Sequence, residues 1–319
     1  MLGLWPALFA CSGDDVAAGD GGDGVAPRND GGAHSGPKAT DADAAIASGA
    51  ADAAMPMADG PSPKKLPKAT EPCPKFVDGD MMFIGRKVRI WVDPDAKKKG
   101  PGPVIFYWHG TGSNPGFEAP LGLGPALQDT VDAGGVVAGF YSEPGGACAD
   151  CTGYGTGNSV WFQGDFRTAD EILACAIEQL NVDTRRIHTA GMSAGGLQVS
   201  AMVYARSSYL ASAVSYSGGK LFVTKWQDDT NKLPVMFTHG GPTDKVTLGF
   251  QALTEGMADE LVARGDFVIV CDHGMGHRIP PDVAGGPTAE FFAAHPFGGT
   301  PEPYAEGLPG TFPDFCKIW

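Results

Sequence analysis

The fold of this chain is decided by the stretch RIHTAGMSAGG, residues 186–196 of 319. Its first five residues predict a short strand, and the apolar residues 197–205 after it predict a helix. Small residues form the turn between them: Gly191, Ala194, Gly195 and Gly196. A turn this tight from a strand into a helix exposes the side chain at its centre, which is Ser193. The stretch therefore predicts a strand–turn–helix unit that holds one serine at the end of a strand.

Further segments of both kinds alternate along the chain. Strands are expected at residues 83–92, 104–108, 135–141, 211–216, 234–238 and 267–271. A helix is expected from Thr168, where Thr168-Ala169-Asp170-Glu171 fits a capping box, and an amphipathic helix within residues 247–264. This alternation indicates an α/β fold, with a mostly parallel central sheet and helices on both faces.

The first part of the chain has a different composition. Residues 12–75 contain no Phe, Tyr or Trp, and residues 12–60 hold nine Asp against only Arg28 and Lys38. Such a segment buries too little apolar surface to offset the entropy lost on ordering. We therefore expect a signal- or lipobox-like segment at residues 1–11, a disordered acidic linker at residues 12–72, and one folded domain at residues 73–319.

The apolar N-terminus ends at a cysteine. Residues 1–10 are too few to span a bilayer and lack the basic residues that begin a signal peptide. Leu8-Phe9-Ala10-Cys11-Ser12 nevertheless resembles a bacterial lipobox, in which the cysteine is lipidated. A lipid on Cys11 would tether the domain to a membrane surface through the long hydrophilic linker. We therefore expect an exported bacterial protein, secreted or held at the cell surface as a lipoprotein; a chance apolar start is the alternative.

Six further cysteines follow: Cys73, Cys148, Cys151, Cys175, Cys271 and Cys316. An even number in an exported protein suggests disulfides, whose pairing the sequence leaves open. The segment from Cys148 to Cys151 has the CxxC spacing of a metal or redox site, but no second CxxC or paired histidine completes a zinc set. We expect loop disulfides, and neither a metal nor an organic cofactor.

The net charge of the chain is −14 at neutral pH. An acidic chain repels the phosphates of nucleic acids and the surfaces of anionic membranes, so neither is expected as a direct partner. The same charge disfavours strongly anionic substrates and favours neutral ones. We expect the protein to be a monomer.

Ser193 is the candidate nucleophile. Its position places the Ala194 N–H at a helix start, where the amide and the helix dipole can stabilise a developing oxyanion. A second donor should come from the loop after an earlier strand, and YWHGTG, residues 107–112, fits this role. An N–H of Gly110 or Thr111 would face the oxyanion. The alternative is an ordinary glycine-rich turn with a solvated serine.

A serine nucleophile needs a base, and the base needs a carboxylate. In this arrangement the acid and then the histidine follow the serine along the chain. Asp244, in the loop after the strand 234–238, is the candidate acid, although an aspartate there can also cap the next helix. His273 lies too close to the last strand to reach back over the turn, so His277 is the candidate base. His239 should order the Asp244 loop.

Four motifs occur in one order along the chain: His109-Gly110-Thr111-Gly112, the turn around Ser193, His239-Gly240 with Asp244, and Gly276-His277. Together they resemble the secreted esterases that include polyhydroxybutyrate depolymerases and feruloyl or acetylxylan esterases, which have the α/β-hydrolase fold. The resemblance covers residues 83–280 and has two departures. Three residues separate His239-Gly240 from Asp244 where the family usually has two, and Ile279 stands where the family often has an aromatic residue.

The resemblance implies a serine esterase. It implies Ser193, Asp244 and His277 as the catalytic triad, and the backbone N–H groups of Thr111 and Ala194 as the oxyanion hole. The implied reaction is hydrolysis of a carboxylic ester, small or polymeric, of polyester, feruloyl or acetyl-polysaccharide type, through an acyl-enzyme. Two alternatives remain: a serine peptidase on the same fold, and a non-catalytic surface lipoprotein that binds polysaccharide or polyester.

Overall fold

The computed structural model describes residues 62–63, 65–142, 160–221 and 225–319. Within them, nine strands form one sheet: β1 (Gly79–Phe83), β2 (Arg86–Val92), β3 (Gly102–Trp108), β4 (Val136–Phe140), β5 (Val182–Met192), β6 (Ser212–Tyr216), β7 (Val235–His239), β8 (Val268–Asp272) and β9 (Cys316–Ile318). Their order across the sheet is β1-β2-β4-β3-β5-β6-β7-β8-β9. The six strands from β4 to β8 run parallel, while β2 and β9 pair antiparallel with the two sides of this block and β1 forms a hairpin with β2. The predicted mostly parallel sheet is confirmed.

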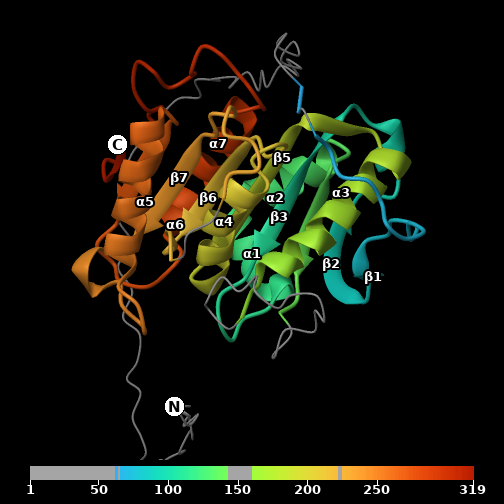
Figure 1. Cartoon of the computed structure of the whole chain (residues 1–319), viewed down its shortest axis with the longest axis horizontal. Coiled ribbons are helices and arrows are strands. Elements are labelled where there is room, and N and C mark those ends of the chain that lie inside the picture. The colour runs from blue at the N-terminus through green and yellow to red at the C-terminus, as the bar shows by residue number, and fades with distance from the viewer. Residues whose placement is uncertain (1–61, 64, 143–159, 222–224) are drawn as a thin grey trace, which may run out of the picture. The chain divides into compact units, whose positions relative to one another are not determined.

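Helices cover both faces of the sheet (Figure 1). The helices of the described residues are α1 (Pro115–Leu123), α2 (Pro125–Asp132), α3 (Phe166–Gln179), α4 (Ala194–Ala205), α5 (Phe250–Arg264), α6 (Pro281–Ala284) and α7 (Gly286–Ala294). Side chains of α3, α4 and α5 join one hydrophobic core, and those of α1, α2, α6 and α7 join a second core on the other face. The predicted α/β architecture with two helical layers is therefore confirmed.

The central strand β3 shows why the sheet is buried on both faces. All seven of its residues are buried. Phe106 and Trp108 point into the core beneath α3 and α4, whereas Ile105 and Tyr107 point into the core beneath α1 and α2. Successive side chains of a strand alternate between faces, so a continuous apolar run fills both cores at once. This is the strand that carries the YWHGTG loop at its carboxyl end.

The expectation of one strand at residues 83–92 is wrong. β1 ends at Phe83 and β2 begins at Arg86, and the two strands pair as a hairpin. Ile84 and Gly85 form the turn with φ angles of 41° and 77°. Positive φ at both central residues is typical of the two-residue turns that join twisted strands. The apolar alternation continues on both sides of the turn, and for this reason the sequence pattern predicted a single strand.

The expected capping box at Thr168 is also wrong. The helix α3 begins two residues earlier, at Phe166, and its N-cap residue Asp165 makes no side-chain cap hydrogen bond. The Asp165 carboxylate instead accepts the Phe162 N–H at 2.8 Å and pairs with Arg86 at 2.6 Å. A short 3₁₀ turn, η2 (Gln163–Asp165), leads directly into the helix and sets its start.

Residues upstream of Cys73 already contact the domain. The Thr70 and Glu71 N–H groups donate to the buried Glu171 carboxylate at 2.8 and 2.9 Å, and Leu66 packs against the core. The packed part of the chain thus starts a few residues before the expected boundary at Cys73. The lipobox-like segment with Cys11, residues 1–11, and most of the expected linker, residues 12–61, lie outside the described residues.

Two disulfides join distant parts of the described chain. Cys73 is bonded to Cys175 on α3, and Cys271 at the end of β8 is bonded to Cys316 on β9. The expectation of disulfides is therefore confirmed for these four cysteines. Cys148 and Cys151 lie outside the described residues.

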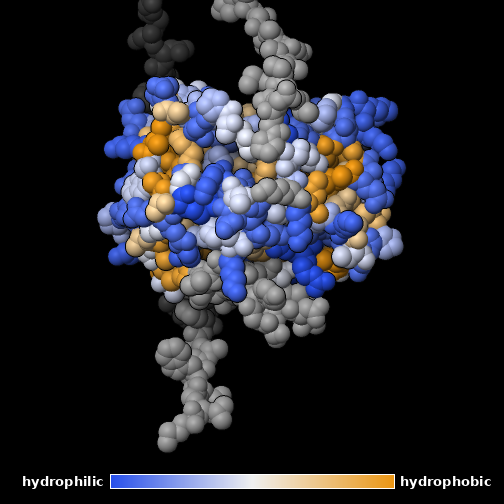
Figure 2. Space-filling model, turned by 45° about the horizontal axis from the view of Figure 1, so that its top comes forward, coloured by the Kyte–Doolittle hydropathy of each residue, from blue (hydrophilic) through white to orange (hydrophobic). Residues whose placement is uncertain are grey.

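The outer surface carries mostly hydrophilic side chains, with separate hydrophobic patches on the face that Figure 2 shows. In the described part of the chain, no helix combines the length and the apolar character needed to cross a bilayer.

Candidate active site

Ser193 lies at the turn between β5 and α4, as the sequence predicts. Its backbone has a φ of 58° and a ψ of −118°, and its N–H donates to the Tyr216 carbonyl at 2.9 Å. A residue other than glycine is strained in this backbone conformation. A serine strained in this way, directly between a parallel strand and a helix, has the geometry of a nucleophile elbow.

Glycines around Ser193 let the elbow pack directly against neighbouring backbone. A Cβ added to Gly195 would overlap the carbonyl oxygen of Trp108 on β3. A Cβ added to Gly196 would lie 2.6 Å from the carbonyl oxygen of Tyr216 on β6. The elbow is therefore held between the ends of β3 and β6, and neither position has room for a side chain.

Replacing Gly195 with alanine should destabilise the domain by about 3 kcal/mol or more, because the clash is with backbone that belongs to the sheet. Gly256, inside α5, provides the matched control, since a Cβ there meets nothing within 4 Å. Gly256→Ala should stabilise the protein by about 0.5–1 kcal/mol, as expected for a helix interior. Urea unfolding measures both. A Gly195→Ala protein as stable as wild type would show that the elbow is not packed in this way.

Three side chains predicted from different parts of the chain meet at this turn. The Ser193 hydroxyl lies 2.8 Å from Nε2 of His277. Nδ1 of the same ring lies 2.7 Å from Oδ1 of Asp244. Asp244 follows β7 and His277 follows β8, so both residues come from loops at the carboxyl ends of parallel strands, beside the end of β5.

Asp244 is completely buried and is held by more than the histidine. Its second oxygen, Oδ2, accepts the Gly240 N–H at 2.9 Å and the Ser217 hydroxyl at 2.8 Å. Burial by itself would raise the pKa of Asp244, but the hydrogen bonds from His277, Gly240 and Ser217 outweigh it and hold the pKa below its ordinary value. The group is therefore an ionised carboxylate at neutral pH, and Nδ1 of His277 carries the proton between them.

Two residues of this site were missed by the sequence analysis. Ser217 follows β6 directly, has a φ of 45°, and points its hydroxyl at Asp244. Phe250, the first residue of α5, stacks on the His277 ring with centroids 4.6 Å apart. Ser217 could have been suspected from its position at the end of the strand next to the elbow, whereas nothing local marks Phe250.

The other histidines near the site have different partners. His239 is buried, and its Nδ1 accepts the Gly241 N–H at 3.1 Å, within the loop that leads to Asp244. His273 is buried, its Nδ1 accepts the Met275 N–H at 3.2 Å, and burial lowers its pKa. The ring that reaches Ser193 is that of His277.

The candidate oxyanion donors lie on both sides of Ser193. Ala194 is the first residue of α4, so its N–H belongs to the first turn of that helix. On the other side, the Gly110 N–H donates to Oε1 of Glu118 at 2.9 Å and is not available to a substrate. The Thr111 N–H donates to no atom of the described residues. Of the two loop amides that the sequence allowed, Thr111 is the one left for an oxyanion.

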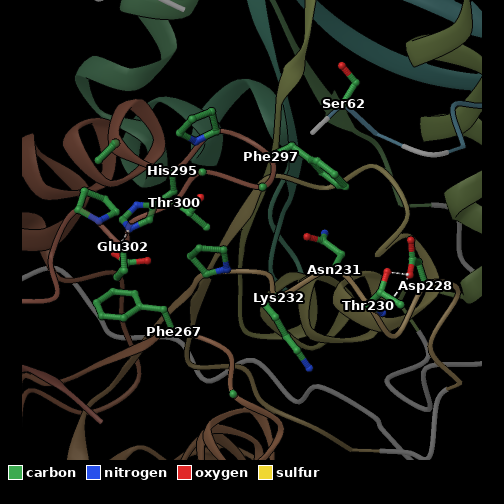
Figure 3. A pocket seen from close by; sticks show the side chains of 17 residues that line it. Ser62, Asp228, Thr230, Asn231, Lys232, Phe267, His295, Phe297, Thr300 and Glu302 are labelled. Carbon is green, nitrogen blue, oxygen red and sulfur yellow. Dashed lines mark hydrogen bonds and ion pairs between the residues drawn. The ribbon is translucent and has the colours of Figure 1, made fainter. Parts of the chain in front are cut away.

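A pocket of about 560 Å³ lies elsewhere in the domain (Figure 3). It is lined by residues that precede β7 and β8, such as Pro234 and Phe267, together with the His295–Glu302 pair. These are the amino ends of the strands, at the edge of the sheet opposite to Ser193. The pocket is therefore separate from the candidate site.

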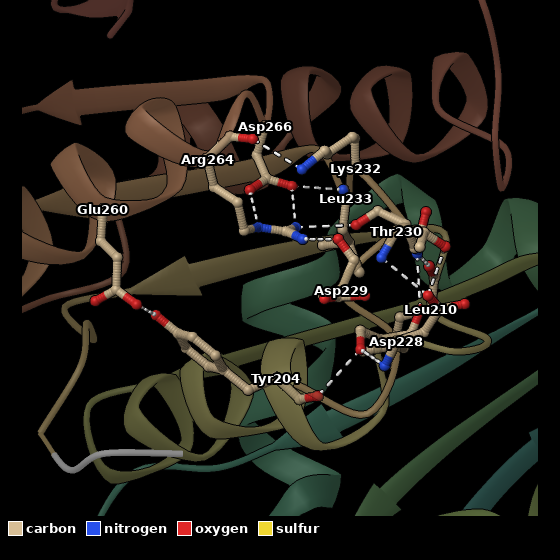
Figure 4. Close-up of polar contacts among 12 residues, drawn as sticks. Tyr204, Leu210, Asp228, Asp229, Thr230, Lys232, Leu233, Glu260, Arg264 and Asp266 are labelled. Atoms are coloured by element: carbon tan, nitrogen blue, oxygen red, sulfur yellow. Dashed lines mark hydrogen bonds and ion pairs between the residues drawn. The ribbon is translucent and has the colours of Figure 1, made fainter. Parts of the chain in front are cut away.

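A group of hydrogen bonds beside that pocket joins the end of α5 to the segment before β7 (Figure 4). Arg264 at the end of α5 binds the Asp266 carboxylate and the carbonyl oxygens of Asp229 and Asn231. Asp266 also accepts the Leu233 N–H at 2.8 Å. The polar groups of Arg264 and Asp266 are thus used in contacts within the chain, and their role is structural.

Among the described residues, no three His, Cys, Asp or Glu side chains gather in a way that could hold a metal ion. The side chains that meet at the Ser193 turn are a hydroxyl, an imidazole and a buried carboxylate.

No protein-family model and no curated protein matches the sequence. Solved structures do resemble the fold. Native pOPH aligns with a TM-score of 0.59 at 18% identity, covering 77% of this chain and 96% of that chain. Native sOPH aligns with a TM-score of 0.54 at 14% identity, covering 80% and 97%. A carboxylesterase of Bacillus cereus has a TM-score of 0.48 at 18% identity, covering 66% and 94%.

The pOPH and sOPH structures share the fold with this chain over almost their whole length. Within this chain, the parallel sheet, the two helical layers and the strained serine between β5 and α4 are the defining elements of one architecture. The protein has the α/β-hydrolase fold.

Proposed function

We propose that the protein is a serine hydrolase that cleaves carboxylic esters, with Ser193 as nucleophile, His277 as base and Asp244 as the orienting acid. The observation that carries the proposal is the continuous line of hydrogen bonds from Asp244 through His277 to the strained Ser193. Each hydrogen bond has the length that proton transfer requires, 2.7 and 2.8 Å. A serine activated in this way attacks acyl groups.

The reaction would proceed in two halves. Nε2 of His277 takes the Ser193 proton as the hydroxyl oxygen attacks the ester carbonyl, and the same ring then gives that proton to the departing alcohol. Water, deprotonated by His277, attacks the acyl-enzyme, and the acid leaves with the serine restored. Asp244 accepts the hydrogen bond from the Nδ1–H of His277 throughout, which keeps Nε2 free to accept a proton and stabilises the charged ring.

The oxyanion of each tetrahedral intermediate would be bound by the Ala194 and Thr111 amides. The Ala194 N–H is supported by the dipole of α4, whose N-terminus lies at Ser193. The Thr111 N–H approaches from the loop after β3, on the other side of the nucleophile. Donors already in place before the reaction stabilise the developing charge without reorganisation.

The substrate class and location follow from the sequence resemblance and are part of the same proposal. We propose a neutral ester of polyester, feruloyl or acetyl-polysaccharide type as substrate, and an exported enzyme that is secreted or tethered through a lipid on Cys11. The net charge of −14 supports a neutral substrate, and the two disulfides are compatible with export.

A substrate panel tests the proposal. The purified protein should hydrolyse p-nitrophenyl acetate and butyrate, and a fluorophosphonate should label one residue, which peptide mapping should place at Ser193. Feruloyl esters, acetylated xylan and a polyester film then distinguish the three substrate types. Faster cleavage of a peptide anilide than of any ester would identify a peptidase instead. Absence of both turnover and labelling would overturn the proposal and favour a binding protein.

A further inference from the structure

Glu118 places a buried carboxylate directly behind the loop that carries Thr111. The residue lies on α1 and is only 7% exposed. Its Oε1 accepts two hydrogen bonds, from the Gly110 N–H at 2.9 Å and from the Tyr107 hydroxyl at 3.1 Å. A Cβ built on Gly110 would lie 3.5 Å from Oε2 of Glu118 and 3.4 Å from Cβ of Ser193. Gly110 thus separates this carboxylate from the nucleophile.

The position of Glu118 is fixed by the packing of α1. Gly122, one turn further along the helix, lies so close to β3 that an added Cβ would overlap the Tyr107 hydroxyl. The Gly122 carbonyl also accepts the Tyr216 hydroxyl at 2.7 Å. Tyrosines from β3 and β6 therefore hold α1 against the sheet, and the carboxylate has little freedom to move.

The next peptide group, between Gly110 and Thr111, is held through the Gly110 carbonyl. Its carbonyl oxygen accepts the Ser113 N–H at 3.1 Å and Nδ1 of His109 at 2.7 Å. Because a carbonyl only accepts, Nδ1 of His109 carries the proton, and Nε2 is then free to accept the Ser142 N–H at 3.3 Å. In a planar trans peptide the N–H points opposite to the C=O, so fixing the Gly110 carbonyl also fixes the direction of the Thr111 N–H.

We propose that Glu118 is a positioning residue for the oxyanion hole: by accepting the Gly110 N–H, it holds the loop so that the Thr111 N–H faces the oxyanion bound at Ser193. This role rests on the proposed esterase function. Glu118 touches no reacting atom. It acts through Gly110: Glu118 accepts the Gly110 N–H, in the peptide from His109, while His109 and Ser113 donate to the Gly110 carbonyl, in the peptide to Thr111.

A carboxylate suits this position because a charged acceptor makes a stronger and shorter hydrogen bond to an amide than a neutral one. Within the described residues, no Lys or Arg acts on Glu118, and burial raises the pKa of its carboxyl group above the ordinary value. Burying an ionisable side chain without a basic partner lowers stability. Glu118 thus lowers the stability of the fold while it fixes the Gly110 loop, and such a loss of stability in favour of function is expected at an active site.

Two substitutions separate the acceptor from the charge. Glu118→Gln keeps an oxygen for the Gly110 N–H and removes the charge, whereas Glu118→Met keeps the length of the side chain and removes the acceptor. Glu171→Gln on α3 is the matched control, because Glu171 is also a buried carboxylate that accepts backbone N–H groups, but those of Thr70 and Glu71 rather than of the Gly110 loop. Thermal unfolding of each variant establishes that it is folded.

The Met variant should lose kcat by about 10²-fold with KM changed by less than about threefold, close to the loss of one oxyanion donor. The Ki of a boronic acid, which mimics the tetrahedral intermediate, should rise by the same factor. The Gln variant should stay within about fivefold of wild type, since its oxygen replaces the acceptor, and Glu171→Gln should match wild type. Amide hydrogen exchange at Gly110, followed by NMR, should be slow in the wild type and in the Gln variant and fast in the Met variant.

The proposal would be overturned by a Met variant with wild-type kcat, by a Gln variant as impaired as the Met variant, or by a Gly110 amide that stays protected without its acceptor. A wild-type protein with no turnover is a different result, because it rejects the esterase function. Hydrogen exchange at Gly110 would still test whether Glu118 holds that amide.

Discussion

Replacing Ser193 with alanine should lower kcat for a p-nitrophenyl ester by about 10⁶-fold, the size of loss seen when the nucleophile of a serine hydrolase is removed. The Ser193 hydroxyl is the one that Nε2 of His277 contacts, at 2.8 Å. Without it, no acyl-enzyme forms, and the residual rate reflects only the binding and oxyanion donors that remain. Alanine occupies the same strained backbone, so the fold should be retained.

The control for this substitution is a serine that is structural. The Ser208 hydroxyl, beyond the end of α4, lies within hydrogen-bond distance of two acceptors, the Gln227 side-chain oxygen at 2.7 Å and the Lys65 carbonyl at 3.1 Å. Ser208→Ala should keep wild-type turnover and take up one fluorophosphonate label, while Ser193→Ala should take up none. Mass spectrometry of the labelled proteins and urea unfolding of both variants complete the test. A folded Ser193→Ala protein that retains more than a small fraction of the activity would place the nucleophile elsewhere.

The fold and the candidate site could be predicted where the signals are local or follow from chain order. A glycine-rich turn between a strand and a helix marks Ser193 without knowledge of any contact. Asp244 and His277 each follow a later strand, and parallel strands bring their carboxyl ends to one edge of the sheet. Chain order alone therefore predicts that the three side chains meet, although it gives no distances.

The remaining residues of the site depend on packing between elements. Glu118 lies eight residues after Gly110, and only the close packing of α1 on Tyr107 brings it back to that amide. Phe250 reaches His277 because α5 starts beside the Asp244 loop, where the Phe250 N–H donates to the Asp244 carbonyl at 3.0 Å. Neither residue type is unusual at its position in the sequence, so no local pattern distinguishes these residues from ordinary core residues.

The edges of the sheet were the least predictable part for a similar reason. β9 has three residues, two of them exposed, and it pairs with β8 from 45 residues away, next to the Cys271–Cys316 disulfide. So short a segment has no measurable alternation. The hairpin of β1 and β2 was missed because a two-residue turn interrupts an alternating pattern without changing its phase.

Replacing Asp244 with asparagine should lower kcat by about 10⁴-fold, and the hydrogen bonds around Oδ2 explain why. The Gly240 N–H and the Ser217 hydroxyl both donate to Oδ2, so the asparagine oxygen must occupy that position to satisfy two buried donors. Its NH₂ group then faces Nδ1 of His277. The ring can accept this hydrogen bond only if its proton moves to Nε2, and Nε2 then has no lone pair to take the Ser193 proton.

Two further substitutions serve as controls for this prediction: Ser217→Ala beside Asp244, and Asp259→Asn away from it. Ser217→Ala removes one of the two donors to Oδ2 and leaves the carboxylate charged, so kcat should fall by no more than about tenfold. Asp259, on the exposed side of α5, bonds only the Trp319 ring N–H among the described residues, and its amide variant should match wild type. Steady-state kinetics of the three variants on one p-nitrophenyl ester give the comparison.

The depressed pKa of Asp244 adds a dependence on pH that distinguishes a wrong tautomer from a simple loss of structure. Because the folded pKa lies below the unfolded value, the charge on Asp244 stabilises the fold above about pH 4, and this stability is lost as the pH falls through the folded pKa. The difference in unfolding free energy between wild type and Asp244→Asn should therefore shrink as the solution is acidified below pH 4. The loss of kcat should persist at pH 8, where Asp244 of the wild type remains ionised. An Asp244→Asn protein within tenfold of wild-type activity would mean that the His277 tautomer is set by another group.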